Sequence, residues 1–159
     1  MSGIIMLFDI FQAGISLFRE PHETRWNPYG LQGDILLFFR DFKKSIDSKD
    51  VQRIQNLISD NYYSKSFVNQ NKKQLLSWFQ EVFQKMPSVV YPSLEIEICK
   101  APEIRREDQV YLVLRPTLNI HILGINLASQ LFGTKSRISM LIERNTNSGL
   151  FSITNMEEI

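Results

Sequence analysis

Three polar side chains at alternate positions, Thr117, Asn119 and His121, are the best candidates for chemistry in this chain. In an extended strand they share one face, while the aliphatic residues between them occupy the other. Histidine titrates near neutral pH, so His121 could act as a general base on a carbonyl compound, and Asn119 could bind the same ligand. The alternative is that this face meets solvent or a partner subunit and carries no chemistry.

Aromatic and cationic side chains supply a second group of candidates. Tyr62, Tyr63 and Trp78 each combine a large apolar body with a polar tip, which suits the rim of a pocket. Tyr111 and Arg115 share one strand face, where Arg115 could anchor an anionic ligand or form a cross-strand ion pair. Packing in a core or an interface would account for the aromatic residues equally well. The predicted ligand-binding residues are Tyr62, Tyr63, Trp78, Tyr111, Arg115, Asn119 and His121.

Several kinds of site are missing from the sequence. It contains no glycine-rich phosphate loop, no Ser-x-x-Lys or Gly-x-Ser-x-Gly motif and no cluster of metal ligands. The single cysteine, Cys99, excludes an internal disulfide framework. Lysine and arginine number 18 against 17 acidic residues, so no overall field attracts nucleic acid. The sequence therefore predicts no metal, no cofactor and no nucleic-acid partner.

The elements that must position these residues are amphipathic helices followed by strands. Apolar residues recur at helical spacing from Asp34 to Ile46 and again from Val51, with Tyr62 and Tyr63 expected in the last turn of that second helix. A third helix is expected to start near Asn71 and to stop at Pro87. Asp34 and Asp50 are the expected N-caps of the first two helices.

Beyond Pro87 the apolar period changes from helical spacing to two. Residues 101–108 read as a charged turn region, and Pro116 should force a bulge, an edge or a bend in its strand. The alternating pattern predicts strands at Leu94–Ile98, Val110–Leu123, Arg137–Arg144 and Leu150–Met156.

The first 33 residues form a separate unit in this interpretation, an amphipathic helix and a connector, before a domain at 34–159. Residues 3–18 are apolar but fall short of the roughly 20 residues that span a bilayer. They also lack the basic start and the cleavage site of a secretory signal. The expected helix packs on its own domain or on a dimer mate. Membrane-surface attachment is disfavoured because its polar stripe is poor in Lys and Arg, and a cytoplasmic location follows by default.

Four stretches carry a resemblance to a known family: Asp34–Ile46, Lys49–Tyr62, Ser136–Glu143 and Gly149–Thr154. In this order they resemble the first two helices and the final hairpin of the nuclear transport factor 2-like superfamily, the cystatin-like α+β roll. The resemblance covers residues 34–156. It implies a cone-shaped roll in which three helices pack on a strongly curved, mostly antiparallel sheet whose concave side commonly encloses a pocket.

The superfamily includes ketosteroid isomerases, scytalone dehydratases, polyketide cyclases and members without catalysis, so the fold alone does not decide the function. Resemblance to the isomerases would imply a site with an aspartate base on a strand and a tyrosine donor on the first helix. Here Asp34–Asp47 contains no tyrosine, and no aspartate follows Asp108. The dehydratase type relies on paired histidines, whereas only His121 falls in the predicted sheet.

We therefore expect a non-catalytic binding or interaction domain. It would hold an apolar small molecule or peptide in the cone, or scaffold a protein partner, and form a homodimer through the outer face of the sheet. The alternative is a small isomerase or cyclase acting on a hydrophobic carbonyl compound. In that case His121 is the general base, and Tyr62 or Tyr63 polarises the carbonyl.

Overall fold

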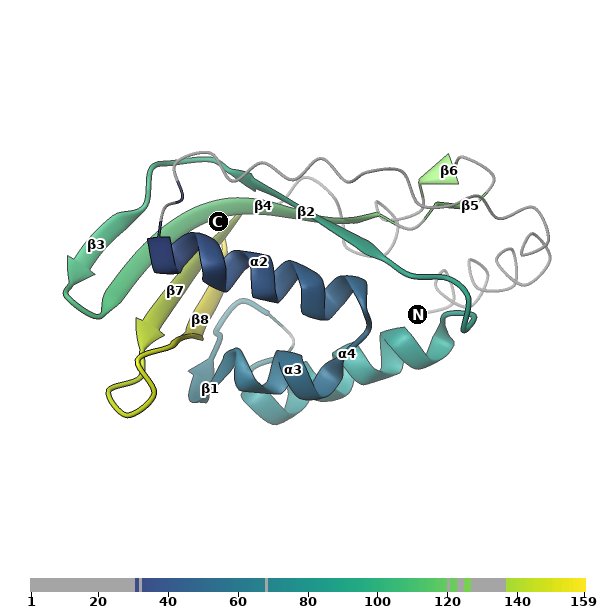
Figure 1. Cartoon of the computed structure of the whole chain (residues 1–159), viewed down its shortest axis with the longest axis horizontal. Helices are drawn as coiled ribbons and strands as arrows, with labels where there is room; N and C mark the ends of the chain where they lie inside the picture. The colour runs from purple at the N-terminus through teal and green to yellow at the C-terminus, as the bar shows by residue number, and fades with distance from the viewer. Residues whose placement is uncertain (1–30, 32, 68, 120, 123–124, 127–136) are drawn as a thin grey trace.

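The computed structural model describes residues 31, 33–67, 69–119, 121–122, 125–126 and 137–159, and for 119–126 the backbone alone. Three helices lie on one side of a strongly curved sheet (Figure 1). The helices are α2 (Gly33–Asp47), α3 (Val51–Asn56) and α4 (Lys72–Lys85). The strands are β1 (Ile58–Tyr63), β2 (Ser93–Ile98), β3 (Glu103–Arg106), β4 (Gln109–Asn119), β5 (His121–Ile122), β6 (Ile125–Asn126), β7 (Ile138–Arg144) and β8 (Phe151–Glu158).

Six of these strands form one sheet in the order β1-β8-β7-β4-β2, and β3 also pairs with β4. The β1–β8 pair is parallel, and the other described pairs of this sheet are antiparallel. The sheet is open between β1 and β2, and β5 and β6 form a separate pair. An α+β roll with three helices on a curved, mostly antiparallel sheet confirms the predicted fold class.

Side-chain caps define where the helices α3 and α4 begin. The Asp50 carboxylate accepts a hydrogen bond from the Arg53 N–H at 3.0 Å, as predicted. Asn71 and Gln74 form a reciprocal capping box, since each side chain accepts from the other's backbone N–H, at 2.9 and 3.3 Å. The expected cap at Asp34 is wrong. Helix α2 starts at Gly33, and Asp34 lies in its first turn, 3.0 Å from the Arg144 guanidinium.

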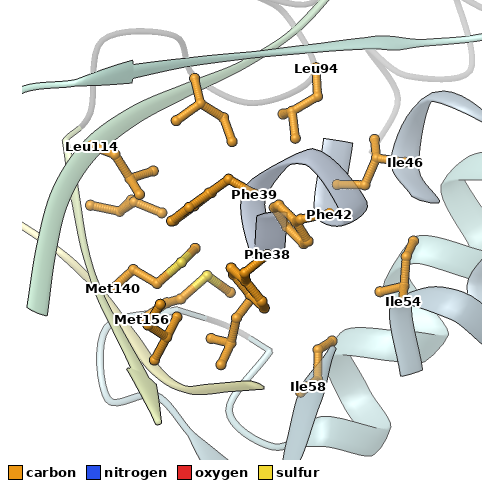
Figure 2. Packing of buried hydrophobic residues seen from close by; sticks show 14 of the residues in the cluster. Phe38, Phe39, Phe42, Ile46, Ile54, Ile58, Leu94, Leu114, Met140 and Met156 are labelled. Carbon is orange, nitrogen blue, oxygen red and sulfur yellow. The ribbon is translucent and has the colours of Figure 1, made fainter. Parts of the chain in front are cut away.

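The core lies between the helices and the concave face of the sheet. Figure 2 shows Phe39 of α2 pointing toward Leu114 of β4 and Met140 of β7, with Phe38 and Phe42 beside it. Phe39 has no exposed surface, and its ring meets the Phe38 ring edge-on with 5.1 Å between centroids. Burying aromatic rings removes large apolar areas from water, so the burial of these α2 side chains in the core they share with β4 and β7 holds α2 to the sheet.

The second helix is shorter than predicted. It ends at Asn56 with Leu57 as its C-cap, and the chain then becomes extended, so Tyr62 and Tyr63 lie in β1 instead of a last helical turn. Strand β1 pairs in parallel with β8, with Ile58 opposite Ile153. Pairing with β8, which is distant in the sequence, overrode the local helical pattern, since the preference of a short segment for helix or strand depends on its packing partners.

Two further features of the strands differ from or refine the prediction. The charged region 101–108 contains β3, whose four residues are all exposed, so its sequence carries no alternation to detect.

Pro116 sits inside β4 opposite Ile96, beyond the last described β4–β7 pair, Leu114–Ile138. Proline has no backbone N–H to donate, and at this position no described hydrogen bond to β7 requires one.

The predicted N-terminal helix at residues 3–18 and the connector up to residue 30 lie outside the described residues. Within the described part of the chain, no helix is long and apolar enough to cross a membrane.

Replacing Phe39 with Ala should destabilise the fold strongly, because it empties the contact between α2 and the sheet. We expect a loss of about 3–5 kcal/mol in the free energy of unfolding, measured by urea denaturation. Leu37 on the same helix is 57 % exposed, so Leu37→Ala is the matched control and should cost about 0.5 kcal/mol or less. Equal losses in the two variants would contradict this placement of the core.

Candidate functional site

A cavity of about 950 Å³ lies between the helices α2 and α4 and the concave face of the sheet. Its sheet-side lining includes buried aliphatic residues of three strands, Leu94, Ile96, Leu114, Leu118, Ile138 and Met140. The helices contribute further apolar side chains, Phe42, Ile46, Leu75, Trp78 and Phe79. The charged residues of the lining, Lys73, Glu81 and Glu158, are all exposed. The cavity thus has an apolar interior and a polar mouth.

Tyr62 is the polar side chain most deeply placed in this lining. It is 3 % exposed, and its hydroxyl oxygen is buried. Burial raises the pKa of Tyr62 to about 12, and the charge of Glu157 adds to that rise. A hydrogen bond with the Ser64 hydroxyl acts in the opposite direction, and that hydroxyl also bonds to Glu157 and to the Phe67 N–H. At neutral pH the Tyr62 phenol is therefore protonated, and its hydroxyl oxygen is buried beside Ser64.

A cluster around Glu157 fastens the loop after β1 to the end of β8. The Glu157 carboxylate accepts hydrogen bonds from the Ser64 hydroxyl at 2.7 Å, the Lys65 N–H at 2.7 Å and the Ser66 N–H at 3.0 Å. Desolvation opposes ionisation, but these bonds together lower the pKa of Glu157 to about 2. The carboxylate is therefore ionised at neutral pH and holds Tyr62's strand against β8.

The structure separates the predicted site residues. Tyr62 and Trp78 line the cavity, whereas Tyr63 is 50 % exposed and is not part of the lining. Tyr111 and Arg115 do not line it either. The Arg105 guanidinium lies 4.1 Å from the centre of the Tyr111 ring, and Arg115 pairs with Glu97 on the neighbouring strand at 2.9 Å. Arg115 thus forms the cross-strand ion pair that was the alternative to anion binding.

Asn119 and His121 have described backbones only. Asn119 pairs with Ser93 at the end of β4, and His121 pairs with Asn126 in the small β5–β6 sheet. Their side chains lie outside the described residues, so the predicted roles of Asn119 and His121 stay predictions.

Sequence reasoning missed the carboxylate that shapes the site, Glu157, and its partner Ser64. The two residues are 93 positions apart, and a glutamate near the end of a strand carries no local signal of such a contact. The apolar sheet wall was more accessible to prediction. Alternation placed Leu118, between Thr117 and Asn119, on the apolar face of its strand, and Leu118 is buried.

Comparisons with known proteins support the fold. No protein-family model and no curated protein matches the sequence. Among solved structures, an NTF2-like protein of unknown function in nutrient uptake from Rhodospirillum rubrum is 13 % identical, with a TM-score of 0.58 over 79 % of this chain and 97 % of that one. The Aln2 protein from a Streptomyces species is 10 % identical, with a TM-score of 0.62 over 79 % and 87 % of the two chains.

A scytalone dehydratase-like protein from Novosphingobium aromaticivorans is 8 % identical, with a TM-score of 0.57 over 79 % of this chain and 80 % of that one. At these identities the likeness establishes the architecture: the chain has the nuclear transport factor 2-like fold. Because this fold serves both enzymes and binding proteins, the function has to be argued from the cavity itself.

Replacing Glu157 with Gln should lower the stability of the protein against unfolding at neutral pH, and the loss should be smaller in acid. The folded-state pKa of Glu157 is lowered from 4.5 to about 2, so its contribution is present above about pH 4.5 and is lost as the pH falls toward 2. The urea midpoints of wild type and Glu157→Gln should therefore differ at pH 7 and converge near pH 2. Glu158→Gln is the control, since the exposed Glu158 carboxylate makes none of these contacts. A difference that is independent of pH would refute the ionised cluster.

Proposed function

We propose that this protein is a non-catalytic binding domain that holds an apolar small molecule in the cavity between α2, α4 and the concave face of the sheet. The single observation that carries the proposal is a space of about 950 Å³ with an apolar interior and a polar mouth. Protein interiors are otherwise close-packed, and ligand sites commonly measure about 300–1,000 Å³.

The distribution of polar groups favours a small molecule over an extended peptide. A peptide carries an N–H and a C=O at every residue, and each needs a partner when it is buried. The buried lining is mainly aliphatic and aromatic. An apolar compound leaves few groups unpaired, and its burial contributes about 25 cal/mol per Å² of apolar surface.

The second candidate is the small isomerase or cyclase, with His121 as general base. The observation that favours it is the place of Tyr62 among the lining residues, although its buried hydroxyl would have to turn toward the cavity to polarise a carbonyl. Tyr63, the other predicted donor, lies outside the lining and is no longer part of this hypothesis. The scytalone dehydratase-like protein has the same architecture, so the fold is compatible with an enzyme. At 8 % identity this likeness assigns no role to any residue of this chain.

We further propose that the outer face of the sheet forms a homodimer interface, in keeping with the sequence-based expectation of a homodimeric cytoplasmic protein. On neighbouring strands Tyr111 lies opposite Leu141 and Val113 lies opposite Ser139. Tyr111 and Leu141 are half-buried, whereas Val113 and Ser139 are already buried within the chain, so Tyr111 and Leu141 carry the surface that a partner could cover. Tyrosine is among the residues enriched at interface centres.

A bulky side chain at an exposed position of the cavity lining should weaken ligand binding without unfolding the protein. Ser77 is an exposed lining residue of α4, and Gln84 is exposed two turns further along the same helix and outside the lining. We expect Ser77→Trp to weaken binding of the apolar dye Nile red by about tenfold, equal to roughly 1.4 kcal/mol. Gln84→Trp should bind like wild type in the same fluorescence titration.

Native mass spectrometry of the purified protein extends this test. A bound compound that is recovered unchanged after incubation supports the binding domain. Chemical conversion that His121→Ala abolishes would instead support the isomerase or cyclase. Wild-type protein that binds neither Nile red nor any copurifying compound would overturn the small-molecule site.

The proposed dimer interface can be tested with a matched pair of lysine substitutions. Leu141 lies on the outer sheet face, whereas Leu150 is 70 % exposed in the β7–β8 loop. Leu141→Lys should convert the dimer to a monomer in light scattering after size exclusion, because an unpaired charge is costly in a buried interface. Leu150→Lys should stay dimeric. A wild-type monomer at all concentrations would exclude the interface.

A further inference from the structure

We propose that helix α2 carries a second binding surface on its exposed side, a basic groove that docks an acidic peptide segment of a partner protein. The groove measures about 570 Å³, and its lining consists of Arg40, Lys43, Lys44, Asp47, Ser48 and Tyr91. It shares no lining residue with the cavity between α2, α4 and the sheet. The inference is therefore independent of the proposed small-molecule site.

Two of the charges in the groove cancel each other. The Lys43 ammonium lies 2.6 Å from the Asp47 carboxylate. Lys43 also donates to the Leu94 carbonyl at 3.0 Å, and Asp47 accepts the Leu94 N–H at 2.7 Å. These bonds hold the end of α2 against the edge strand β2. Among the described lining residues Asp47 is the one acid, and it is already engaged with partners inside the protein.

Arg40 and Lys44 supply the positive charge that remains. Both side chains are exposed, and neither pairs with a carboxylate of the described residues. They are four positions apart in α2, so they lie on the same side of the helix, where like charges repel each other. Lys44 complements the helix dipole because it lies in the last turn, whereas Arg40 lies a turn earlier. An anionic ligand that contacts both side chains would relieve their repulsion.

Tyr91 adds an apolar wall to the groove, and Lys49 holds it in place. The Lys49 ammonium lies 4.5 Å from the centre of the Tyr91 ring and donates to the Pro87 carbonyl at 3.3 Å. Lys49 makes these contacts from a backbone φ of 56°, a conformation that is unfavourable for residues other than glycine. Tyr91 is 47 % exposed, so part of its ring can pack against an apolar side chain of a ligand. Lys49 also places a third cation beside the groove.

The spacing of the cations favours a ligand with several separate carboxylates. Arg40 and Lys44 are about 6 Å apart along the helix axis. Carboxylates at alternate positions of an extended peptide are about 6.6 Å apart, so each cation can meet a carboxylate of its own. A single inorganic phosphate would contact the two cations less well and would leave most of the groove and the Tyr91 ring uncovered.

The surrounding charge favours an acidic protein over a nucleic acid. The formal net charge of the chain is only +1, and the exposed Asp41 carboxylate lies next to Arg40 in α2. A nucleic-acid strand carries a charge at every nucleotide and gains its affinity from many phosphate contacts, whereas this groove offers three cations between acidic neighbours. A peptide that alternates acidic and apolar residues matches both the cations and Tyr91.

A peptide of alternating Glu and Ala tests the groove, and a Gln–Ala peptide of the same length is its neutral control. We would label both with the same dye and follow fluorescence anisotropy at about 50 mM salt, where exposed charges are weakly screened. Wild type should bind the Glu peptide and not the Gln peptide, and added salt should weaken the binding. Arg40→Gln combined with Lys44→Gln should weaken it by about fivefold, as expected for the loss of two exposed charge pairs.

The matched control variant combines Lys100→Gln with Arg106→Gln. It removes one lysine and one arginine from exposed positions outside the groove, so the change in net charge is the same. The control variant should bind the Glu peptide like wild type. The groove variant should keep the wild-type urea midpoint, because it breaks no described ion pair, and this result separates lost binding from lost folding.

Carbodiimide coupling shows where the peptide lies, because it joins a carboxylate to a lysine amine in contact with it. Coupled peptide should map to Lys44 or Lys49 and not to Lys100. Equal binding of the two peptides by wild type, unchanged affinity in the groove variant or an equal loss in the control variant would overturn the proposal. An oligothymidylate that binds wild type more tightly than the Glu peptide, and loses affinity in the groove variant, would assign the groove to nucleic acid instead.

Discussion

The packing of α2 against the concave face of the sheet is the contact on which the rest of this structure depends. A curved sheet presents a hollow that one helix cannot fill along its whole length. Phe38, Phe39 and Phe42 fill one part of it against Leu114 and Met140. Between α2 and α4 the hollow stays open as the cavity, and both helices contribute residues to its lining. Core and cavity are therefore two parts of the same concave surface.

The fold was largely predictable from local patterns. Helical spacing in α2 and α4, the cap at Asp50, the helix start near Asn71, and alternation in β2 and β4 all correspond to the observed elements. The errors fall where distant contacts or exposure decide the conformation. Residues Ile58–Tyr63 are extended because β8 pairs with them, and β3 has no buried face to leave a pattern.

The candidate site was predictable only in part, for the same reason. Aromatic residues with polar tips were sensible candidates, and Tyr62 and Trp78 do line the cavity. The choice between Tyr62 and Tyr63 depended on whether these residues formed a helix or a strand, since adjacent residues of a strand point to opposite faces. The carboxylate that acts on Tyr62 comes from the far end of the chain and could not be inferred from residues near it.

The parallel pairing of β1 with β8 has a consequence for the order in which the molecule is assembled. Strand β8 lies between β1 and β7, and the Ile153 N–H donates to the Leu57 carbonyl at 2.8 Å. During synthesis β1 emerges long before the strand it pairs with, so Tyr62 cannot take its place until residues 151–158 have left the ribosome. Contacts that close such long loops form late and slow folding. The helices and the central strands can associate first, and a ligand can meet a complete cavity only after residues 151–158 have been translated.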